Sequence, residues 1–457
     1  MPTTMEYRYL APSAISEDGG RADLSLATSG GVEPDADEVK HPYFFSGFLE
    51  HPGVVASALL VVARVSRTRF YTPPNVVAAV LRAADPVVTS TDEGLRFEAF
   101  SVCCGVYVRL DVLSSALDSQ FWATGVTNVD INPPLRQALA GLRALEPLHL
   151  SVGAEEVRVT TLDGAVTEEK VTLPTRWCRG FAETQFLSAH MGLRHELDSS
   201  STRSFIQGLP RSTATKSVMW ATTSMRSLRL ASGPSTGAVC LAGPERLRVV
   251  EPLLRYATGL KAYAAEANSR SLPMASGWVM DLPGARLTIA LSPEKPRGFS
   301  GEGAVLTGLS TSTVDDDADL VSAMLSFEPR IDIARLAADT ALNPTRVTDA
   351  LGVLASSGQV GYDLAADAYF HRPLPLVPEA LTVLHPRLGN AQALAGCGAV
   401  TRTGDGDYTV RSGEVDYLVH LSPEGDRCTC PWWAKHRGTR GPCKHVLAAR
   451  IVEDRHG

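Results

Sequence analysis

Three cysteines and one histidine near the end of the chain have the residue types and the spacing of a metal site. They form two pairs, Cys428-x-Cys430 and Cys443-x-His445, with twelve residues between them. Thiolate sulfur and neutral imidazole nitrogen are the ligands that tetrahedral zinc prefers. Two pairs that bracket a loop are a stronger signal than one pair alone. Four protein ligands leave no coordination position for water, so we expect a structural zinc site rather than a catalytic one.

The spacing within each pair also predicts the local backbone. Residues i and i+2 of an extended strand point to the same face, so Cys428 and Cys430 can reach one ion. On a helix, residues two apart do not face each other, so we expect Cys443 just before a helix and His445 in its first turn. Pro442 suits that boundary. The helix would bury an apolar stripe made of Val446, Leu447 and Ile451.

These residues closely resemble the SWIM-type zinc finger, a family that pairs Cys-x-Cys with Cys-x-His. Residues 408–410 and 415–421 are similar to the hairpin that precedes the ligands in that family. The resemblance covers residues 400–453 and implies a small ββα-type finger that holds zinc and binds DNA or proteins. Because SWIM fingers occur in otherwise unrelated chains, the resemblance implies a module and not a reaction.

The segment around the expected zinc site is basic. From Arg427 to Arg450 the chain has six basic side chains and no acidic one. Three thiolates and one zinc ion leave a charge of about −1, so the module stays positive. The two tryptophans in this segment could stack on bases or on a partner, or cover the small core. The candidate partner-binding residues are Trp432, Trp433, Lys435, Arg437, Arg440 and Lys444.

Composition limits the class of protein. The 457 residues are 44% hydrophobic and 20% charged, which is typical of a soluble chain with roughly two to four domains. A formal net charge of −7 means that any contact with nucleic acid must be local. The five other cysteines are odd in number and scattered, which argues against a disulfide framework and suits a reducing compartment. The N-terminus lacks the features of a signal peptide, and the longest apolar run, residues 53–63, is too short to span a bilayer. We expect a cytoplasmic protein without a membrane partner.

Residues 1–310 predict an α+β fold of one or two domains. The hydrophobic patterns within it predict distinct elements. They are a β-rich stretch over 41–117 with a short helix at 76–84, a hairpin over 148–173 around Asp163-Gly164, a helix over 177–190, a polar loop over 196–216, an amphipathic helix over 245–268, and strands over 278–291 around Pro283-Gly284.

Residues 316–373 resemble a winged helix-turn-helix that follows a linker at 311–317. We expect helices over 318–327 and 331–340, a third helix from residue 344, and two wing strands at 360–363 and 368–371. The unit's usual function is DNA binding through its third helix. Residues 315–372 carry four arginines against ten acidic side chains, a net charge of −6, whereas phosphate binding needs several cations on one face. We therefore expect a packing or protein-contact role, with a DNA-binding regulator as the alternative.

A Walker-type phosphate loop is missing from the sequence, which contains no Gly-Lys dipeptide. We therefore expect a zinc-binding, non-enzymatic adaptor for a protein partner or a nucleic acid. Chains of this layout resemble bacterial SWIM proteins that look like partners of AAA-type ATPases and von Willebrand A-domain proteins. The alternative class is an enzyme whose active site lies within residues 1–310 without a recognised motif.

Overall fold

The structure is a computed structural model that describes most of the chain. The described residues are 5–7, 9–18, 20–34, 38–71, 85–142, 147–153, 171–173, 175–214, 217–224, 227–301, 303–307, 313–374, 386–422 and 425–456.

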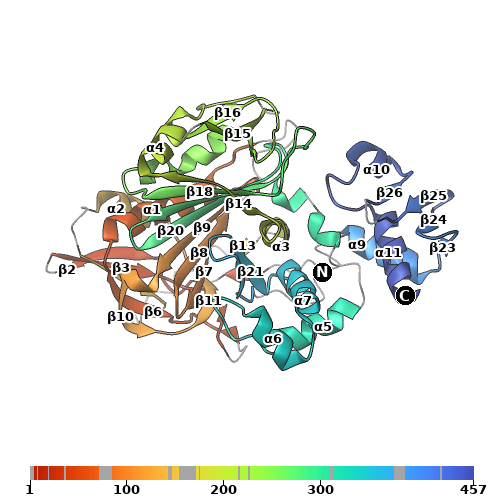
Figure 1. The fold of residues 1–457 in the computed structure, drawn as a ribbon. Coiled ribbons are helices and arrows are strands. Elements are labelled where there is room, and N and C mark those ends of the chain that lie inside the picture. The colour runs from red at the N-terminus through yellow and green to blue at the C-terminus, as the bar shows by residue number, and fades with distance from the viewer. Residues whose placement is uncertain are drawn as a thin grey trace.

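A ten-stranded antiparallel sheet forms the centre of the large body (Figure 1). Its strands in spatial order are β14 (Gly192–Asp198), β18 (Gly259–Ala264), β19 (Ser276–Leu282), β20 (Ala285–Leu291), β9 (Val106–Leu113), β8 (Gly94–Phe100), β7 (Val87–Thr91), β11 (Gly125–Asn128), β4 (Gly31–Val32) and β5 (Glu38–Val39). The predicted strands over 278–291 are confirmed as the β19–β20 hairpin, whose turn has Gly284 at φ +65°. A positive φ favours glycine, which explains the Pro-Gly pair there.

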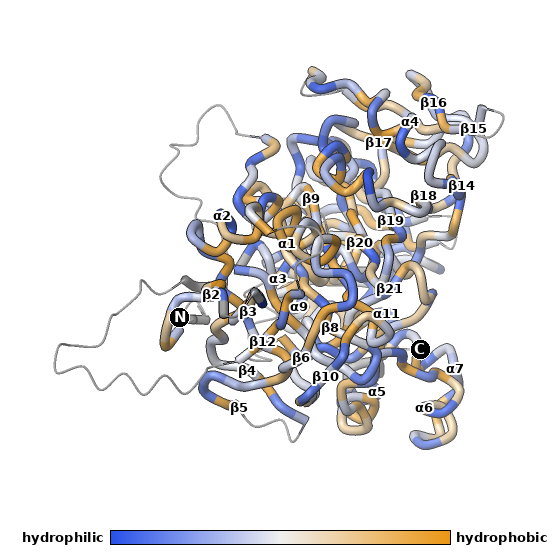
Figure 2. Tube along the Cα trace, turned by 90° about the vertical axis from the view of Figure 1, so that its left-hand side faces the viewer, coloured by the Kyte–Doolittle hydropathy of each residue, from blue (hydrophilic) through white to orange (hydrophobic). Residues whose placement is uncertain are grey.

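The described residues up to 242 form three smaller sheets as well. A five-stranded sheet has the order β10 (Leu117–Trp122), β6 (Phe45–Leu49), β12 (Leu148–Val152), β3 (Arg21–Leu26) and β2 (Ala14–Asp18). A three-stranded sheet consists of β16 (Ser227–Ala231), β15 (Val218–Ser224) and β17 (Val239–Ala242), and β1 (Met5–Tyr7) pairs with β13 (Val171–Leu173). Apolar residues gather in the central strands and in the helix beside them, as Figure 2 shows.

The helices of the body cover these sheets. They are α1 (Pro52–Arg67), α2 (Pro133–Gly141), α3 (Thr175–Ser188) and α4 (Ser199–Gly208), with 3-10 turns η2 (Ser114–Ala116), η3 (Pro244–Leu253), η4 (Phe299–Gly301) and η5 (Ala304–Thr307). The predicted helix over 177–190 is confirmed as α3. Its Phe181 is fully buried and meets Phe100 of β8 edge to face, with ring centroids 5.0 Å apart. Such aromatic pairs fix α3 on the central sheet.

The β-rich prediction for 41–117 is wrong at α1, a 16-residue helix. Its Val and Ala run is buried on most sides against β8, β9 and β20, with Val55, Leu59 and Val62 fully buried. A short apolar run does not by itself distinguish a buried helix from a strand, and here packing decides. Pro52 stands in the first turn, where its missing N–H costs nothing.

Two further predictions are corrected. Residues 245–268 are not one amphipathic helix: η3 ends at Leu253, just after Pro252, and β18 follows. The polar stretch 196–216 is not a loop throughout, because β14 runs to Asp198 and α4 follows it. The Asp198 carboxylate accepts the Ser201 N–H at 2.7 Å and caps α4, a start signal that the serine-rich composition obscured. The tip of the predicted hairpin over 148–173 and the predicted helix over 76–84 lie outside the described residues.

Helices and strands are present where the winged-helix resemblance predicts them. They are α5 (Thr313–Ser322), α6 (Ile333–Thr340), α7 (Pro344–Ser356), β21 (Val360–Asp363) and β22 (Ala368–His371). Since α5 begins at Thr313, the second half of the expected linker is helical. Whether these elements act as a winged helix stays a prediction. The third helix offers no free arginine near its start, because Arg346 makes two hydrogen bonds of 2.7 and 2.6 Å with Asp317.

Buried ion pairs fasten α5–β22 to the central sheet. Arg372 contacts Glu98 of β8 at 2.8 Å, and both side chains are completely buried. Arg109 of β9 contacts Asp363 of β21 at 2.7 Å. Burial alone would raise the pKa of Asp363, but the guanidinium of Arg109 and two further arginines hold that pKa well below its usual range. The unit is therefore part of the body's core rather than a module on a free linker.

Candidate metal centre

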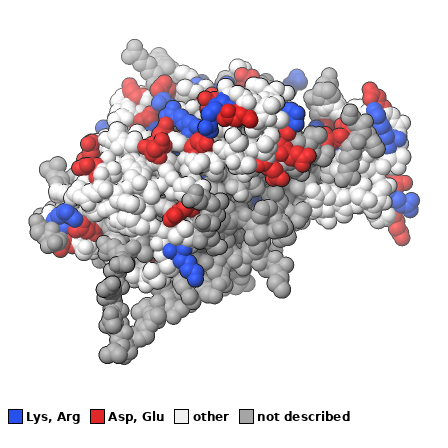
Figure 3. Space-filling model, turned by 90° about the horizontal axis from the view of Figure 1, so that it is seen from below, with Lys and Arg blue, Asp and Glu red and all other residues white. Residues whose placement is uncertain are grey.

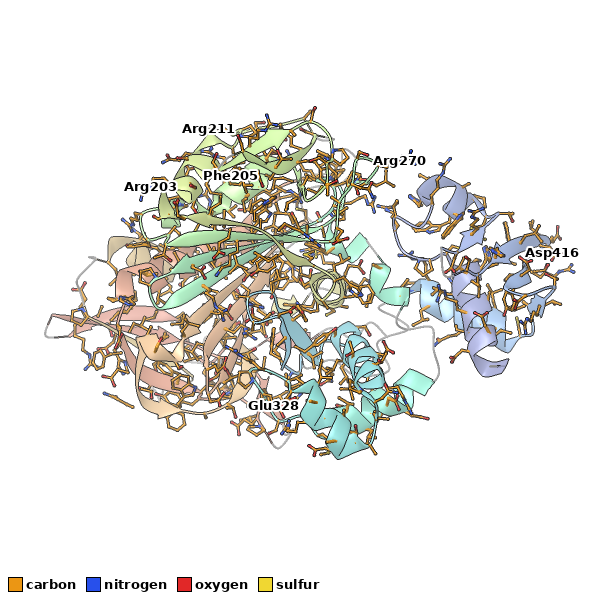
Figure 4. The ribbon with its side chains drawn as sticks, viewed as in Figure 1. Arg203, Phe205, Arg211, Arg270, Glu328 and Asp416 are labelled. Atoms are coloured by element: carbon orange, nitrogen blue, oxygen red, sulfur yellow. The ribbon has the colours of Figure 1, made fainter. Side chains whose placement is uncertain are left out.

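The C-terminal module has its own small core, and Figure 1 shows it at one end of the molecule, beside the large body. Its elements are α9 (Pro386–Gly396), β23 (Val400–Arg402), β24 (Asp407–Ser412), β25 (Val415–His420), β26 (Arg427–Cys428), α10 (Pro431–His436) and α11 (Lys444–His456). The four strands form one antiparallel sheet, on which α11 packs. Val446 and Leu447 of α11 are fully buried, as the predicted stripe requires. Asp416 of β25 lies on the outer side of the module, away from the body (Figure 4).

The four predicted ligands come together in this core. The Sγ atoms of Cys428, Cys430 and Cys443 and a ring nitrogen of His445 lie within 4.8 Å of one another, and all four residues are buried. Cys428 ends β26, and Cys443 immediately precedes α11, with His445 in the first turn of that helix, as predicted. The chain is extended at Cys430, as predicted, but a helix begins directly after it. The Cys430 Sγ atom accepts the Trp433 N–H at 3.3 Å and so caps α10.

The donor set fits zinc. A tetrahedron with Zn–S of about 2.3 Å and Zn–N of about 2.0–2.1 Å has edges of roughly 3.5–3.8 Å. The Cys428 Sγ and His445 Nδ1 atoms are 3.8 Å apart. Tyr417 stacks on the His445 imidazole at a centroid distance of 4.3 Å and an interplanar angle of 21°, which holds the ring in place. A support of this kind around a ligand fixes its orientation.

Protons and zinc compete for this cluster. The hydrogen bond with Cys443, together with burial, raises the pKa of the Cys428 thiol well above its usual range, while the same bond lowers the pKa of Cys443 to about 4. In the metal-free cluster the Cys428 thiol therefore keeps its proton at neutral pH, whereas Cys443 is a thiolate. Zinc requires thiolates, so its binding releases that proton.

Comparison with known proteins agrees with this geometry. Residues 417–450 match the family model of the SWIM zinc finger. No curated protein matches the chain. A solved structure of Proliferating Cellular Nuclear Antigen from Entamoeba histolytica covers 55% of this chain and 100% of its own, at 10% identity and a TM-score of 0.33. A chain of the PCNA2–PCNA3 complex from Sulfolobus tokodaii covers 55% of this chain and 99% of its own, at 7% identity and a TM-score of 0.34. Such low TM-scores support no inference about this chain.

The two tryptophans stand on α10, where we expected a loop. Both are half-buried and pack on the finger's core. The ring centroids of Trp432 and His436 are 4.3 Å apart. The Arg387 guanidinium lies over the Trp432 ring, 4.8 Å from the centroid of that ring. Trp433 lies close to Gly438, at which an added Cβ would stand 3.2 Å from the indole. Covering the core is thus one role of both rings, and their exposed edges remain candidates for partner contact.

The candidate cations differ in exposure. Lys435 and Arg437 are exposed, whereas Arg440 and Lys444 are half-buried. Arg437 has φ +45° at the C-cap of α10, where its N–H donates to the Trp433 carbonyl at 2.7 Å. Arg450, the last basic residue of the segment, pairs with Asp426 at 2.8 Å. Elsewhere, the face in Figure 3 shows basic and acidic side chains interspersed, so a basic patch must be local.

Two cations that sequence reasoning missed approach the same place. The Arg387 Nη1 atom of α9 donates to the carbonyls of Arg440 and Pro442 at 2.8 and 3.1 Å. Arg297 of the body lies within 3.5 Å of the Thr439 carbonyl. Burial, Arg440, Lys435, Arg297 and Arg387 together lower the pKa of His436. No local motif marks Arg297 or Arg387, since both lie far upstream of the ligands.

The finger also contacts the body at its ligand loop. Ala182 of α3 and Val305 and Leu306 of η5 belong to the finger's core cluster. Gly441, at φ +73°, lies so close to Gly303 that an added Cβ would overlap the Gly303 carbonyl. No bulkier residue fits there, so the loop that carries Cys443 rests directly on the body.

Proposed function

We propose that this protein is a non-enzymatic recognition protein whose zinc finger presents a cationic patch to a carboxylate-rich surface of a protein partner. The cationic patch consists of Lys435, Arg437, Arg440 and Lys444 of the finger together with Arg387 and Arg297, the last of which also pairs with Glu294 at 3.0 Å. The observation that carries the proposal is the convergence of four of these cations, from three separate segments, on the surroundings of His436. Scattered solvated charges would not produce that convergence.

Charge balance favours a protein over a nucleic acid as the partner. The chain has a net charge of −7, and few of the patch cations are fully exposed. Duplex binding draws most of its affinity from several phosphate contacts. A compact patch with tryptophan edges suits a smaller, carboxylate-rich epitope, in which a few aromatic and arginine contacts dominate. The alternative is that the finger binds a nucleic acid. DNA binding through α7 is a second alternative, with less support.

Zinc has a structural role in this proposal. Cys428, Cys430, Cys443 and His445 would fill its coordination and hold α10 and the start of α11 in fixed positions. Loops on rigid scaffolds are where binding residues concentrate. We further infer a cytoplasmic, reducing setting, and a partner of the AAA-type ATPase or von Willebrand A-domain class, from the resemblance to bacterial SWIM proteins. An active site in residues 1–310 remains the alternative function.

Two probes test the proposal with the full chain. Fluorescence anisotropy would follow labelled polyglutamate and a short labelled DNA duplex across a range of salt concentrations. We expect saturable binding of polyglutamate that is tighter than binding of the duplex. If instead the duplex binds more tightly, with a log–log salt slope of about −3, three or four phosphates are engaged and the nucleic-acid alternative is correct. Saturable binding of neither probe would contradict both forms of the proposal.

A further inference from the structure

A groove on the large body, at the opposite end from the finger, has the composition of a ligand site (Figure 1). It lies between α1, α2 and the end of η3, and its volume is about 660 Å³. Pockets for small organic ligands span about 300–1,000 Å³. No feature of the zinc site or of the proposed partner surface accounts for this groove.

The groove combines an apolar floor with a rim of arginines. Leu60 and Val61 of α1 and Leu139 and Leu142 of α2 and its C-cap form much of the floor. The rim carries Arg64, Arg67, Arg136 and Arg255. Positions 57, 60, 64 and 67 of α1 recur at helical spacing, so one face of this helix supplies both apolar and cationic groups. Figures 1 and 2 both show α2 beside α1.

The described residues give the rim charges no carboxylate partner at ion-pair distance. Among the described residues, none of these four arginines forms an ion pair with a carboxylate within 4.0 Å. The Arg67 and Arg136 guanidiniums both donate to the Ile131 carbonyl, at 3.2 and 2.8 Å, so two like charges converge on one neutral oxygen. Burial and the neighbouring Arg67 lower the pKa of Arg136, and the nearby Asp130 offsets this only in part.

The other two rim arginines are exposed and face the same groove. Arg255 donates to the Ser57 hydroxyl at 3.2 Å, which holds it above the α1 face. The Arg64 guanidinium has no hydrogen-bond partner within the part of the chain that the structure describes. Arginine binds carboxylate and phosphate through two parallel N–H groups, so convergent guanidiniums suit such an anion.

We propose that this groove binds a small organic anion with an apolar body, a carboxylate or a phosphate monoester whose charged group lies at the arginine rim. The apolar part would lie on Leu60 and Leu139, and Ser57 and Thr68 add polar contacts at the edge. The site is independent of the zinc finger, so its failure would leave the proposed function untouched. The ligand class follows from the charge of the rim, because a neutral or cationic amphiphile would leave the guanidiniums unpaired.

Isothermal titration calorimetry with the full chain tests this site. The probes are decanoate, decyl phosphate, decanol and decyltrimethylammonium, each below its micellar concentration. We expect decanoate or decyl phosphate to bind in a one-to-one ratio, and decanol and decyltrimethylammonium to bind at least about tenfold more weakly. The better of the two anions identifies the head group. Equal affinity for the anion and the alcohol, or no saturable binding of either anion, would overturn the proposal.

Matched variants then locate the binding. Arg64→Gln removes a rim charge that has no hydrogen bond to lose among the described residues, so the fold should survive. Loss of one charge-assisted contact should weaken anion binding about tenfold. Arg211→Gln is the control, since Arg211 is exposed, is not among the residues that line the groove, and lies at the top of the body in Figure 4. If Arg64→Gln and Arg211→Gln bind the anion as tightly as the parent, the groove is not the site. Tighter binding of an acidic peptide than of either small anion would also contradict the proposal.

Discussion

The body and the finger are stabilised in different ways. The body buries a continuous apolar core whose described members run from Tyr9 to Leu374, and it places buried ion pairs where α5–β22 meets the sheet. The finger buries far fewer apolar side chains and arranges four of its buried groups as metal ligands. Small units that cannot build a sufficient core commonly use a metal instead. The difference indicates that zinc should decide the finger's fold and leave the body's fold almost unaffected.

The largest expected effect separates the two regions. Cys428→Ser removes one of four ligands from a site whose metal-binding free energy is about 10 kcal/mol, most of which is folding energy. We expect zinc to be lost and residues 386–456 to lose protection from hydrogen exchange, while the central sheet keeps its protection. Metal analysis and hydrogen-exchange mass spectrometry measure both.

Cys397→Ser is the matched control for this change. Cys397 belongs to the same module but is exposed and outside the ligand cluster. The Cys397→Ser variant should retain about one zinc per chain and the hydrogen-exchange protection of the parent. Retention of zinc by the Cys428 variant, or loss of protection across the central sheet, would contradict the division between the two regions.

The next largest effect concerns the body alone. Arg372→Ala would leave Glu98 buried with an uncompensated charge, since both side chains of this pair are completely buried. Breaking such a pair costs about 3–5 kcal/mol, which denaturant titration of the body's transition measures. Arg335→Ala removes a partly exposed ion pair with Glu328, a residue marked in Figure 4, and should cost less than about 1 kcal/mol. Similar losses of unfolding free energy from both changes would show that the burial of the Arg372–Glu98 pair does not determine how much it stabilises the body.

A smaller effect is expected from pH. Burial lowers the pKa of His371 to about 4, Arg372 adds to the shift, and Glu328 opposes it. The imidazole Nδ1 accepts the Phe327 N–H at 2.8 Å, a bond that protonation would remove. The pKa of His371 in the folded protein lies below its unfolded value of about 6.5. The free energy of unfolding that the neutral imidazole contributes is therefore fully present above pH 6.5, and about 3 kcal/mol of it is lost as the pH falls to 4.

Denaturant titrations of the parent and His371→Gln between pH 7 and pH 4 check this. The parent should lose more stability than the variant over that interval, although other groups also titrate there. Parallel pH profiles for the two proteins would show that His371 is not the responsible group.

Local patterns predicted what depends on local chemistry. The ligand set, the helix start after Cys443 and the β19–β20 hairpin follow from spacing and turn residues, which act within a few positions. The errors arose where distant packing decides. The pattern of the buried Val-rich run of α1 did not distinguish a helix from a strand, and Pro252 with the following β18 was hidden in an apparently amphipathic segment. The serine-rich start of α4 concealed a capped helix.

The candidate sites show the same limit. The four zinc ligands lie within 18 residues, so their spacing is visible in the sequence. Arg297 and Arg387 reach the cationic patch only because the finger rests on the body, and the anion groove joins α1, α2 and η3 across about 200 residues. No pattern in one sequence reports such convergence, because it depends on how the sheets and helices pack.

The most direct test of the central claim, that the zinc-held cationic patch is the recognition surface, is the affinity of the variant Lys435→Ala/Arg437→Ala/Arg440→Ala for polyglutamate. Its zinc content should equal that of the parent. The control Arg402→Ala/Arg411→Ala removes charge from the finger's sheet instead. We expect the triple variant to bind about tenfold more weakly, since a solvent-accessible charge contributes up to about 1 kcal/mol, and the control to bind like the parent. Equal affinity of the triple variant and the parent would contradict the claim.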